Sequence, residues 1–367
     1  MLARVYETVE EMLDAETDAI DAVIVATPDW QHVNHVSACL KANKHVYCDG
    51  EISDSSAKAQ ELVKQAREKK LLVQCGHQRR SNPRYIHIIE KLHHERNIPG
   101  KVTHAYTQWH RAIAPLIRVP DRLVMSTADL QRHGYESMEH LLNWEWFSRF
   151  GLGDVAYRTG QKLDLLRWFW NAEPISVTSL GSNDYFNREA LDFLMSVFTF
   201  KLPTGEIRRG YVQVLSTNSR GGEYDLFSGL VTSEATTGRI RIIQISCSCF
   251  MPSPMKSEEG ITLYSGYGND LDGENIQRAV CDNILLTEKT PPELNRPYFC
   301  NRSYKQYYLN VPAENCNPTI LPHLENFISA IRDGTKLRDP IEQATKNLIA
   351  LEAAVQSARE RRTIDLV

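Results

Sequence analysis

The sequence predicts an α/β domain with a buried parallel sheet, followed by an α+β domain built on an antiparallel sheet. The first domain is predicted by short apolar runs at 22–26, 45–48 and 71–75, which alternate with helical patterns. Apolar and polar residues do not alternate within these runs, as is typical of parallel strands buried on both faces. The second domain is predicted by β-branched and aromatic runs from about residue 175 onward, which are separated by turn signals.

The elements of the first domain, residues 1–99, follow from local signals. Thr8-Val9-Glu10-Glu11 has the pattern of a capping box and predicts a short helix that runs through Ala15. Helical patterns at 31–42 and 55–69 connect the three predicted strands. A further helix, from 82 to about 95, should close the domain.

The second domain, residues 100–321, should carry a mixture of helices and strands. Its expected elements are a strand at 100–111, a long loop at 115–134, a helix with aromatic anchors at 135–150, an amphipathic helix at 160–170, and strands at 175–180, 193–200, 207–217, 226–232 and 238–245. Residues 246–318 are rich in Pro, Asn and Ser and predict a long excursion with little regular structure. The last segment, residues 322–367, should form two helices that pack back on the first domain.

Composition excludes several classes of protein. A length of 367 residues suits two domains, and 42% apolar with 24% charged residues is ordinary for a globular chain. A net charge of −4 gives no reason to expect nucleic-acid or membrane binding. The sequence has neither a signal-peptide pattern nor an apolar stretch of about 18 residues. Eight cysteines, several of them in predicted strands, indicate reduced core residues and a cytoplasmic protein.

Polar segments follow each predicted strand of the first domain. Right-handed crossovers place the carboxyl ends of parallel strands at one edge of the sheet, and ligands bind there. We therefore expect one pocket to be lined by the three segments Thr27-Pro28-Asp29, Asp49-Gly50-Glu51 and Gly76-His77-Gln78-Arg79-Arg80.

These segments resemble motifs of the Gfo/Idh/MocA oxidoreductases. The family's A-T-P-D-x-x-H corresponds to 26–32, and its G-x-Q-R-R-x-N-P-x-Y corresponds to 76–85. Asp49-Gly50-Glu51 stands where the family has E-K-P. The resemblance continues through Gln108-Trp109-His110-Arg111, Asn143-Trp144 and Pro322-His323-Leu324-Glu325-Asn326-Phe327, so it covers nearly the whole chain.

The resemblance implies a Rossmann-like domain, NAD or NADP as cofactor, and a sugar or cyclitol as substrate. The residues that it assigns to the cofactor are Thr27, Pro28, His32, Asp49, Gln78 and Arg79. Those that it places near a sugar are Trp109, His110, Asn143, Trp144 and Tyr157. Packing at the domain interface is the alternative role for Trp109 and Trp144. The resemblance also implies a homodimer or homotetramer formed through the open face of the antiparallel sheet.

The ionisable groups of the family site are replaced in this chain. Gly50, Tyr157 and Gln161 stand at the positions of the family's lysine, aspartate and histidine. Neither Gly50 nor Gln161 can exchange a proton at neutral pH. Lys162 or Asp164, next to Gln161 on the same helix, or Glu51, next to Gly50, could take over as catalytic groups. Alternatively, Lys162 is a solvated helix residue and Asp164 a structural hydrogen-bonding residue.

The Gly-rich turn of the family is not found in the sequence, which contains no G-x-G-x-x-G. In the family a strand that carries this turn would neighbour 22–26, so this run should form an apolar sheet edge. Three interpretations are open: a truncated gene model, a functional deletion whose edge another subunit covers, or a replacement strand at 1–5. An export signal could be lost with the same segment.

The sequence therefore leaves three hypotheses for function. The first is an NAD(P)-dependent oxidoreductase with impaired or altered catalysis, the second a catalytically silent sugar-binding or assembly partner, and the third a non-redox lyase or hydrolase. We predict no metal site. The one-residue gap in Cys247-Ser248-Cys249 is too short for the usual zinc chelate, and Asp270, Asp272 and Glu274 form only part of a calcium loop.

Overall fold

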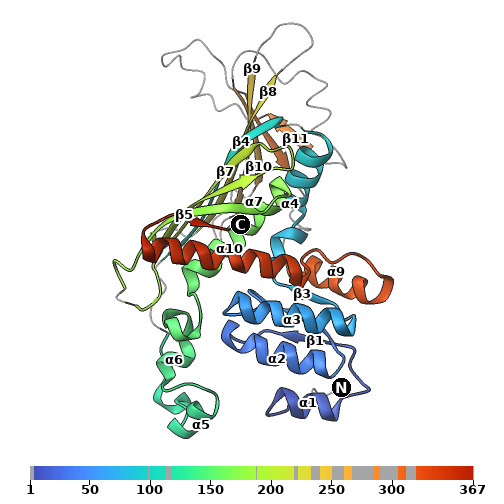
Figure 1. The fold of residues 1–367 in the computed structure, drawn as a ribbon, viewed down its shortest axis with the longest axis vertical. Coiled ribbons are helices and arrows are strands. Elements are labelled where there is room, and N and C mark those ends of the chain that lie inside the picture. Colours follow the sequence, from blue (N-terminus) through green and yellow to red (C-terminus); the bar gives the residue numbers. More distant parts are fainter. Residues whose placement is uncertain are drawn as a thin grey trace.

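A computed structural model describes residues 4–97, 99–112, 117–186, 188–218, 222–232, 240–249, 260–266, 285–288, 305–310 and 320–366. The predicted parallel sheet is confirmed. Its three strands are ordered β1 (Ala22–Val25), β2 (His45–Cys48) and β3 (Val73–Cys75), and both pairs are parallel. The crossover helices are α2 (Asp29–Lys41) and α3 (Ser56–Lys69), which lie against the sheet in Figure 1.

Strand β1 forms an open edge of this sheet. It pairs with β2 on one side, and within the described residues no strand pairs with its other side. The Ile24 side chain is 59% exposed, as the predicted apolar edge requires. Residues 4–6 do not form a strand, so the described part of 1–5 does not supply a replacement. The predicted first helix is present as α1 (Val9–Ala15), where Thr8 Oγ1 accepts a hydrogen bond from Glu11 N at 3.1 Å.

The second sheet is mixed rather than purely antiparallel. Its order is β11-β12-β10-β9-β8-β4-β7-β6-β5-β13, and all neighbours are antiparallel except β4 and β7. Strand β4 comes first of these strands in the chain and lies between β8 and β7 in the centre of the sheet. The strand bounds are β4 Lys101–Ala112, β5 Pro174–Ser182, β6 Phe193–Lys201, β7 Ile207–Asn218, β8 Gly222–Thr232, β9 Ile240–Cys249 and β13 Ile364–Asp365.

The prediction of little regular structure at 246–318 was wrong. Strands β10 (Gly260–Gly266), β11 (Leu285–Glu288) and β12 (Lys305–Asn310) extend the sheet in that range. The Pro- and Asn-rich stretches between them dominate the local composition and hide these short apolar runs. The suggested calcium loop, Asp270 to Glu274, lies outside the described residues.

Two long helices connect the sheets. Helix α7 (Asp154–Trp170) is buried along almost its whole length and packs on β7 and β4. Helix α10 (Ile341–Glu360) contacts β5, α7 and α3, and Figure 1 shows it running between the large sheet and the first domain. Helix α9 (Ile320–Asp333) contacts β2 and the 3-10 turn η1 (Gln78–Ser81).

Other helix predictions were only partly correct. Residues 135–150 form the short helix α6 (Met138–Leu142) and two 3-10 turns, η4 (Trp144–Trp146) and η5 (Ser148–Phe150). Their aromatic side chains pack with Trp30 in a small hydrophobic cluster that is separate from the main core. Packing in this cluster, in place of a continuous helix, holds the segment. The predicted loop 115–134 contains η3 (Asp121–Leu123) and α5 (Thr127–Arg132), and the predicted helix 82–95 consists of α4 (Pro83–Ile86) and the π-helical η2 (His87–Glu95).

The described cysteine side chains are reduced and buried, as expected, at Cys39, Cys48 and Cys75. Cys247 and Cys249 lie in strand β9. Among the described residues, no helix combines the length and the apolar character that a membrane span requires.

Candidate functional site

The structure brings together the polar segments that follow β1, β2 and β3. The buried ring of His32 connects the first two, because Nε2 lies 2.6 Å from the Thr27 carbonyl oxygen and Nδ1 lies 2.7 Å from the Glu51 carbonyl oxygen. Gln78 Nε2 donates to Asp49 Oδ1 at 3.2 Å and connects the second segment to the third. Of the residues assigned to the cofactor, Pro28 is the N-cap of α2, and Arg79 points away toward α7.

A small cavity opens where these segments meet the second domain. Its volume is about 20 Å³, which is enough for one water-sized group. Four carboxylates contribute to its wall, and none of the described residues that line it is a lysine, an arginine or a histidine. The lining residues are Asp29, Glu51, Ser53, Asp54, Trp144, Glu145, Gly151, Leu152, Gly153, Tyr157, Leu348 and Leu351.

Gly50, at the position of the family's lysine, has a backbone conformation that disfavours a side chain. Its φ is +79°, a region that L-residues rarely adopt. A Cβ at this position would lie 3.2 Å from Cε2 of Tyr157 and 3.5 Å from Oδ1 of Asp29. The ring of Tyr157 therefore occupies the space beside residue 50, and a restored lysine would require both backbone and ring to move.

Lys162 is held in a buried ion pair away from the cavity. Its ammonium lies 3.0 and 2.9 Å from the two carboxylate oxygens of Asp225 on β8, and both side chains are 0% exposed. Tyr85 also donates a hydrogen bond to Asp225. Lys162 is thus neither the solvated helix residue that the sequence suggested nor a side chain free to exchange protons with a ligand.

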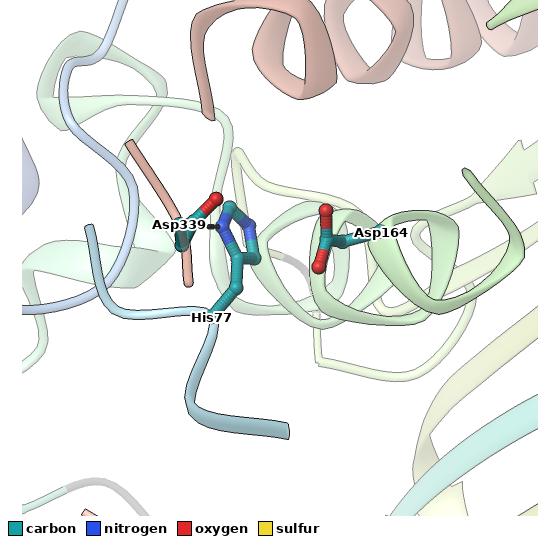
Figure 2. Close-up of side chains that lie close together, drawn as sticks. All are labelled: His77, Asp164 and Asp339. Carbon is teal, nitrogen blue, oxygen red and sulfur yellow. Dashed lines mark hydrogen bonds and ion pairs between the residues drawn. The ribbon is translucent and has the colours of Figure 1, made fainter. Parts of the chain in front are cut away.

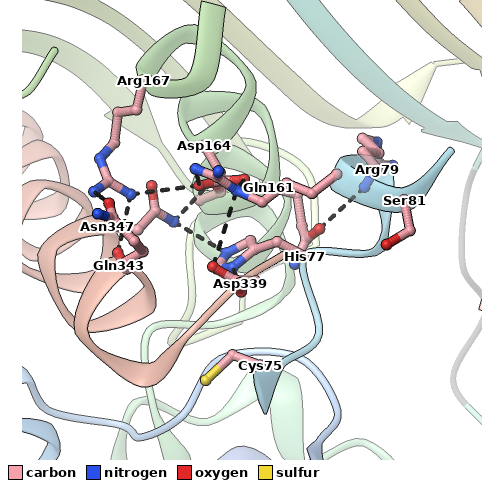
Figure 3. A network of polar contacts seen from close by, with 12 residues as sticks. Cys75, His77, Arg79, Ser81, Gln161, Asp164, Arg167, Asp339, Gln343 and Asn347 are labelled. Atoms are coloured by element: carbon pink, nitrogen blue, oxygen red, sulfur yellow. Dashed lines mark hydrogen bonds and ion pairs between the residues drawn. The ribbon is translucent and has the colours of Figure 1, made fainter. Parts of the chain in front are cut away.

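Asp164 is held by two arginines. Arg80 makes a bidentate pair with it, at 2.7 Å for both contacts, and Arg167 Nη1 lies 3.4 Å from Oδ1. Burial alone would raise the pKa of Asp164, but Arg80 and His77 outweigh this effect and hold the pKa below its usual range. The carboxylate is therefore a structural group, and Figure 3 shows Asp164 and Arg167 within this polar network.

His77 lies beside this arginine pair and contacts residues from three other segments. Its Nδ1 donates to Asp339 Oδ2 at 2.6 Å, and its Nε2 lies 3.4 Å from Glu51 Oε1 (Figure 2 shows the Asp339 bond). Burial opposes the charged ring, but Asp339, Asp164 and Glu51 outweigh it and raise the pKa of His77 well above its ordinary value. The carboxylates of Asp339 and Glu51 beside the ring therefore favour its protonated form.

One group of described residues has a spacing that could suit a metal ion. A ligand atom of each of His77, Asp164 and Asp339 lies within 4.8 Å of the others, and all three residues are buried. However, His77 already donates to Asp339, and Asp164 already accepts both bonds from Arg80. A metal would have to displace protons and a guanidinium that balance the same charges.

Gln161, at the position of the family's histidine, is fixed by Arg79. Arg79 Nη1 donates to Gln161 Oε1 at 3.1 Å, while Gln161 Nε2 is buried without an acceptor among the described residues. The Arg79 guanidinium also lies 4.2 Å from the centroid of the Trp109 ring, and that of Arg158 lies 4.3 Å from it. Trp109 therefore packs against arginines of its own chain, one from the turn η1 and one from α7.

The other residues placed near a sugar are not gathered in one site. Asn143 binds the backbone of Ile117, since its Oδ1 accepts from the amide at 3.0 Å and its Nδ2 donates to the carbonyl at 3.2 Å. His110 lies on β4, in register with Leu215 of β7. Of this set, the structure brings only Trp144 and Tyr157 to the cavity.

Sequence reasoning missed the residues that complete the buried network. Asp339, in the loop before α10, had no pattern that could mark it. Asp225 did have a signal, because it is a charged residue on the buried face of an alternating strand, between Tyr224 and Leu226. Asn347 on α10 donates to the Gly160 carbonyl at 3.0 Å and contacts His77 at 3.2 Å.

Comparison with known proteins gives a family for part of the chain. Residues 2–77 match the model of an oxidoreductase family with an NAD-binding Rossmann fold, GFO_IDH_MocA. The chain is 39% identical over 75 residues to 4-carboxy-2-hydroxymuconate-6-semialdehyde dehydrogenase of Sphingobium sp., covering 20% of this chain and 24% of that protein. It is 34% identical over 91 residues to inositol 2-dehydrogenase of Rubrobacter xylanophilus, covering 24% and 26%. The chain thus spans about a quarter of the length of these two relatives.

The fold resembles solved structures over almost the whole chain. One is the aldose-aldose oxidoreductase from Caulobacter crescentus, described as a complex with glycerol, with a TM-score of 0.65. The match covers 97% of this chain and 83% of that protein at 17% sequence identity. At this identity the likeness shows the two-domain fold alone.

Proposed function

This chain is a Gfo/Idh/MocA-like protein, and from that premise we propose that it binds a sugar- or cyclitol-type ligand without efficient NAD(P)-dependent dehydrogenase chemistry. The ligand class is supported by the names of relatives such as inositol 2-dehydrogenase. One polar group of the ligand would enter the cavity lined by Trp144 and Tyr157, since aromatic side chains offer apolar faces beside a polar tip.

The observation that carries this proposal is the state of Lys162 and Asp164, the two replacement candidates on α7. Lys162 and Asp164 carry ionisable groups of the kind that transfer protons. However, Lys162 forms a buried ion pair with Asp225, and Asp164 forms one with Arg80. A general acid or base must reach the proton that it moves within hydrogen-bond distance. Neither side chain lines the cavity, so neither can serve as the missing group.

NAD or NADP is the cofactor that the family implies, but the described residues do not fit its pyrophosphate. Phosphates bind at helix N-termini with free backbone amides. Helix α3 has its first amide, Ser56 N, bound to the Glu352 carboxylate at 2.8 Å. Helix α2 has Asp29 in its first turn, beside the acidic cavity. A carboxylate therefore lies at both helix N-termini on this edge of the sheet, where it would repel a pyrophosphate. We assign no catalytic step to a dinucleotide.

Calorimetric titrations test the proposal. We expect myo-inositol or an aldose to bind the full chain, and NADH and NADPH to bind weakly or not at all. The reason is electrostatic, because a pyrophosphate would meet carboxylates in place of amides and cations. Micromolar binding of either dinucleotide would contradict the proposal, as would the failure of every sugar and cyclitol to bind.

We also propose that the chain forms a homodimer or homotetramer through the open face of its large sheet. One face is buried by α7 and α10. The strand register places apolar or half-buried side chains in rows on the opposite face, where Tyr106 aligns with Tyr211 and Tyr211 with Val197. Leu180, in the same surface beside Met195, is 64% exposed. An apolar sheet face of this kind is typical of a protein–protein interface.

Substitution of Val197 tests this assembly. Val197→Glu should convert the oligomer to a monomer in size-exclusion chromatography with light scattering, because a charge would be buried at the centre of the interface. The matched control is Leu123→Glu, which changes a side chain that is 58% exposed outside the sheet. A monomeric native chain, or an unchanged mass for Val197→Glu, would disprove the proposal.

A further inference from the structure

The cavity beside Gly50 is lined by carboxyl groups that have few basic partners. Asp54 pairs with Lys58 at 2.9 Å, but within the described residues no lysine or arginine lies within ion-pairing distance of Asp29, Glu51 or Glu145. The nearest basic groups are His32 Nδ1, 4.0 Å from Asp29, and His77 Nε2, 3.4 Å from Glu51. Among the described residues, these three carboxyl groups therefore have only two histidine rings as basic neighbours within ion-pairing distance.

Glu51 provides a second and independent sign that a ligand belongs here. Its side chain is 3% exposed, and neither carboxylate oxygen accepts a hydrogen bond from any described residue. A buried carboxylate without donors is costly, and such groups are normally satisfied by a partner or a bound species. Gly160 leaves space for the Glu51 carboxylate, because a Cβ at residue 160 would lie only 2.5 Å from Glu51 Oε1. Glu51 thus lines a cavity with its acceptors unused.

The potential in the cavity favours a bound positive charge. Burial, followed by Glu51, Glu145, Asp49 and Asp54, raises the pKa of Asp29 well above its ordinary value. Burial and Asp154 also raise the pKa of Glu145, although Arg111, Arg158 and Arg188 oppose them. A raised pKa means that these carboxylates tend to bind a proton. A larger cation with several N–H donors would donate charge-assisted hydrogen bonds to more than one of them.

Size and spacing identify the kind of cation. The cavity of about 20 Å³ holds a group the size of a water molecule, which is also the size of an ammonium group. The only described side chains spaced closely enough for a metal ion are His77, Asp164 and Asp339, so the cavity carboxylates do not form a compact metal shell. An –NH₃⁺ group has three donors and reaches oxygens that lie further apart.

We propose that this cavity receives the protonated amino group of a small ligand, so that the site prefers an amine-bearing sugar or cyclitol to its neutral counterpart. The ligand would bring its own ammonium group to the place beside Gly50 where the family carries a lysine. The inference rests on the proposed function, because it names the class of ligand for the same site.

Paired ligands test the inference by calorimetry. Glucosamine should bind the full chain at least about tenfold more tightly than glucose, since a hydrogen bond to a charged group is worth about 1.4 kcal/mol or more. Methylammonium chloride should compete with glucosamine, and sodium chloride at equal ionic strength should not. Glu51→Gln should remove most of the preference for the amine, so that the ratio of the glucosamine affinity to the glucose affinity falls toward one. Glu68→Gln, at an exposed position on α3, is the matched control.

The possible outcomes are distinct. Equal affinities for glucosamine and glucose would overturn the inference and leave the proposed function intact, whereas no binding of any sugar would contradict both. Competition by Mg²⁺ or Ca²⁺ in place of methylammonium would also overturn it, in favour of a metal site. If Glu51→Gln does not fold, Glu145→Gln on the partly exposed side of the cavity gives the same readout.

Discussion

Replacement of Asp164 by asparagine should lower the free energy of unfolding by about 3–5 kcal/mol. Asparagine keeps the shape of the side chain but removes its charge. Arg167, which is 3% exposed, and the largely buried Arg80 would then lie side by side without their shared counter-ion. Chemical denaturation measures the change, and circular dichroism shows whether the native fold persists.

A surface pair serves as the control for Asp164. Glu61 Oε1 lies 2.6 Å from Lys64 Nζ, and the two side chains are 63% and 64% exposed. Glu61→Gln should cost no more than about 1 kcal/mol, because water already screens this pair. Equal effects of Asp164→Asn and Glu61→Gln would show that the buried network does not stabilise the fold.

The same variant should change how stability depends on pH. The folded-state pKa of Asp164 is lowered, so its contribution is present above the unfolded pKa of about 3.9 and is lost as pH falls through the folded value. Asp164→Asn should therefore flatten the acid limb of the stability curve. The contribution of His77, whose pKa is raised, is present in full below about pH 6.5 and is lost as pH rises through its folded value.

Replacement of Lys162 by methionine is the second large effect that we expect. Methionine fills a similar volume but leaves the Asp225 carboxylate, which is 0% exposed, without its ammonium partner. Breaking a buried ion pair on one side typically costs about 3–5 kcal/mol. Denaturant titration should show a loss of this size in Lys162→Met.

A double-mutant cycle separates a structural role from a catalytic one. Lys162→Met combined with Asp225→Leu should recover most of the lost stability, because the pair is then replaced by apolar side chains of similar size. A catalytic lysine would behave differently. If Lys162→Met were as stable as the native chain but lost an activity, Lys162 would belong to a reaction site.

The fold could be predicted from sequence because its signals are local. The apolar runs at 22–26, 45–48 and 71–75 each ended in a polar segment, and the parallel sheet with its carboxyl edge follows from that pattern. The short strands β10 to β12 were missed because Pro- and Asn-rich segments surround them. The parallel pairing of β4 with β7 joins strands that are far apart in the sequence, which no local pattern records.

The candidate site was less predictable, because its chemistry depends on distant partners. The sequence placed Lys162 and Asp164 beside the lost histidine, but their roles depend on Asp225 and Arg80, which lie 63 and 84 residues away in the chain. Glu51 was found only as a neighbour of Gly50. Its unused oxygens depend on Gly160 and His77, which only the folded structure brings next to it.

The most direct test of the account is the rate at which the full chain reduces NAD⁺ or NADP⁺ in the presence of cyclitols and aldoses, amine-bearing ones included. Because Lys162 and Asp164 are held in buried ion pairs outside the cavity, we predict no reduction above the protein-free control. Substrate-dependent reduction of either nicotinamide by the native chain would contradict the account.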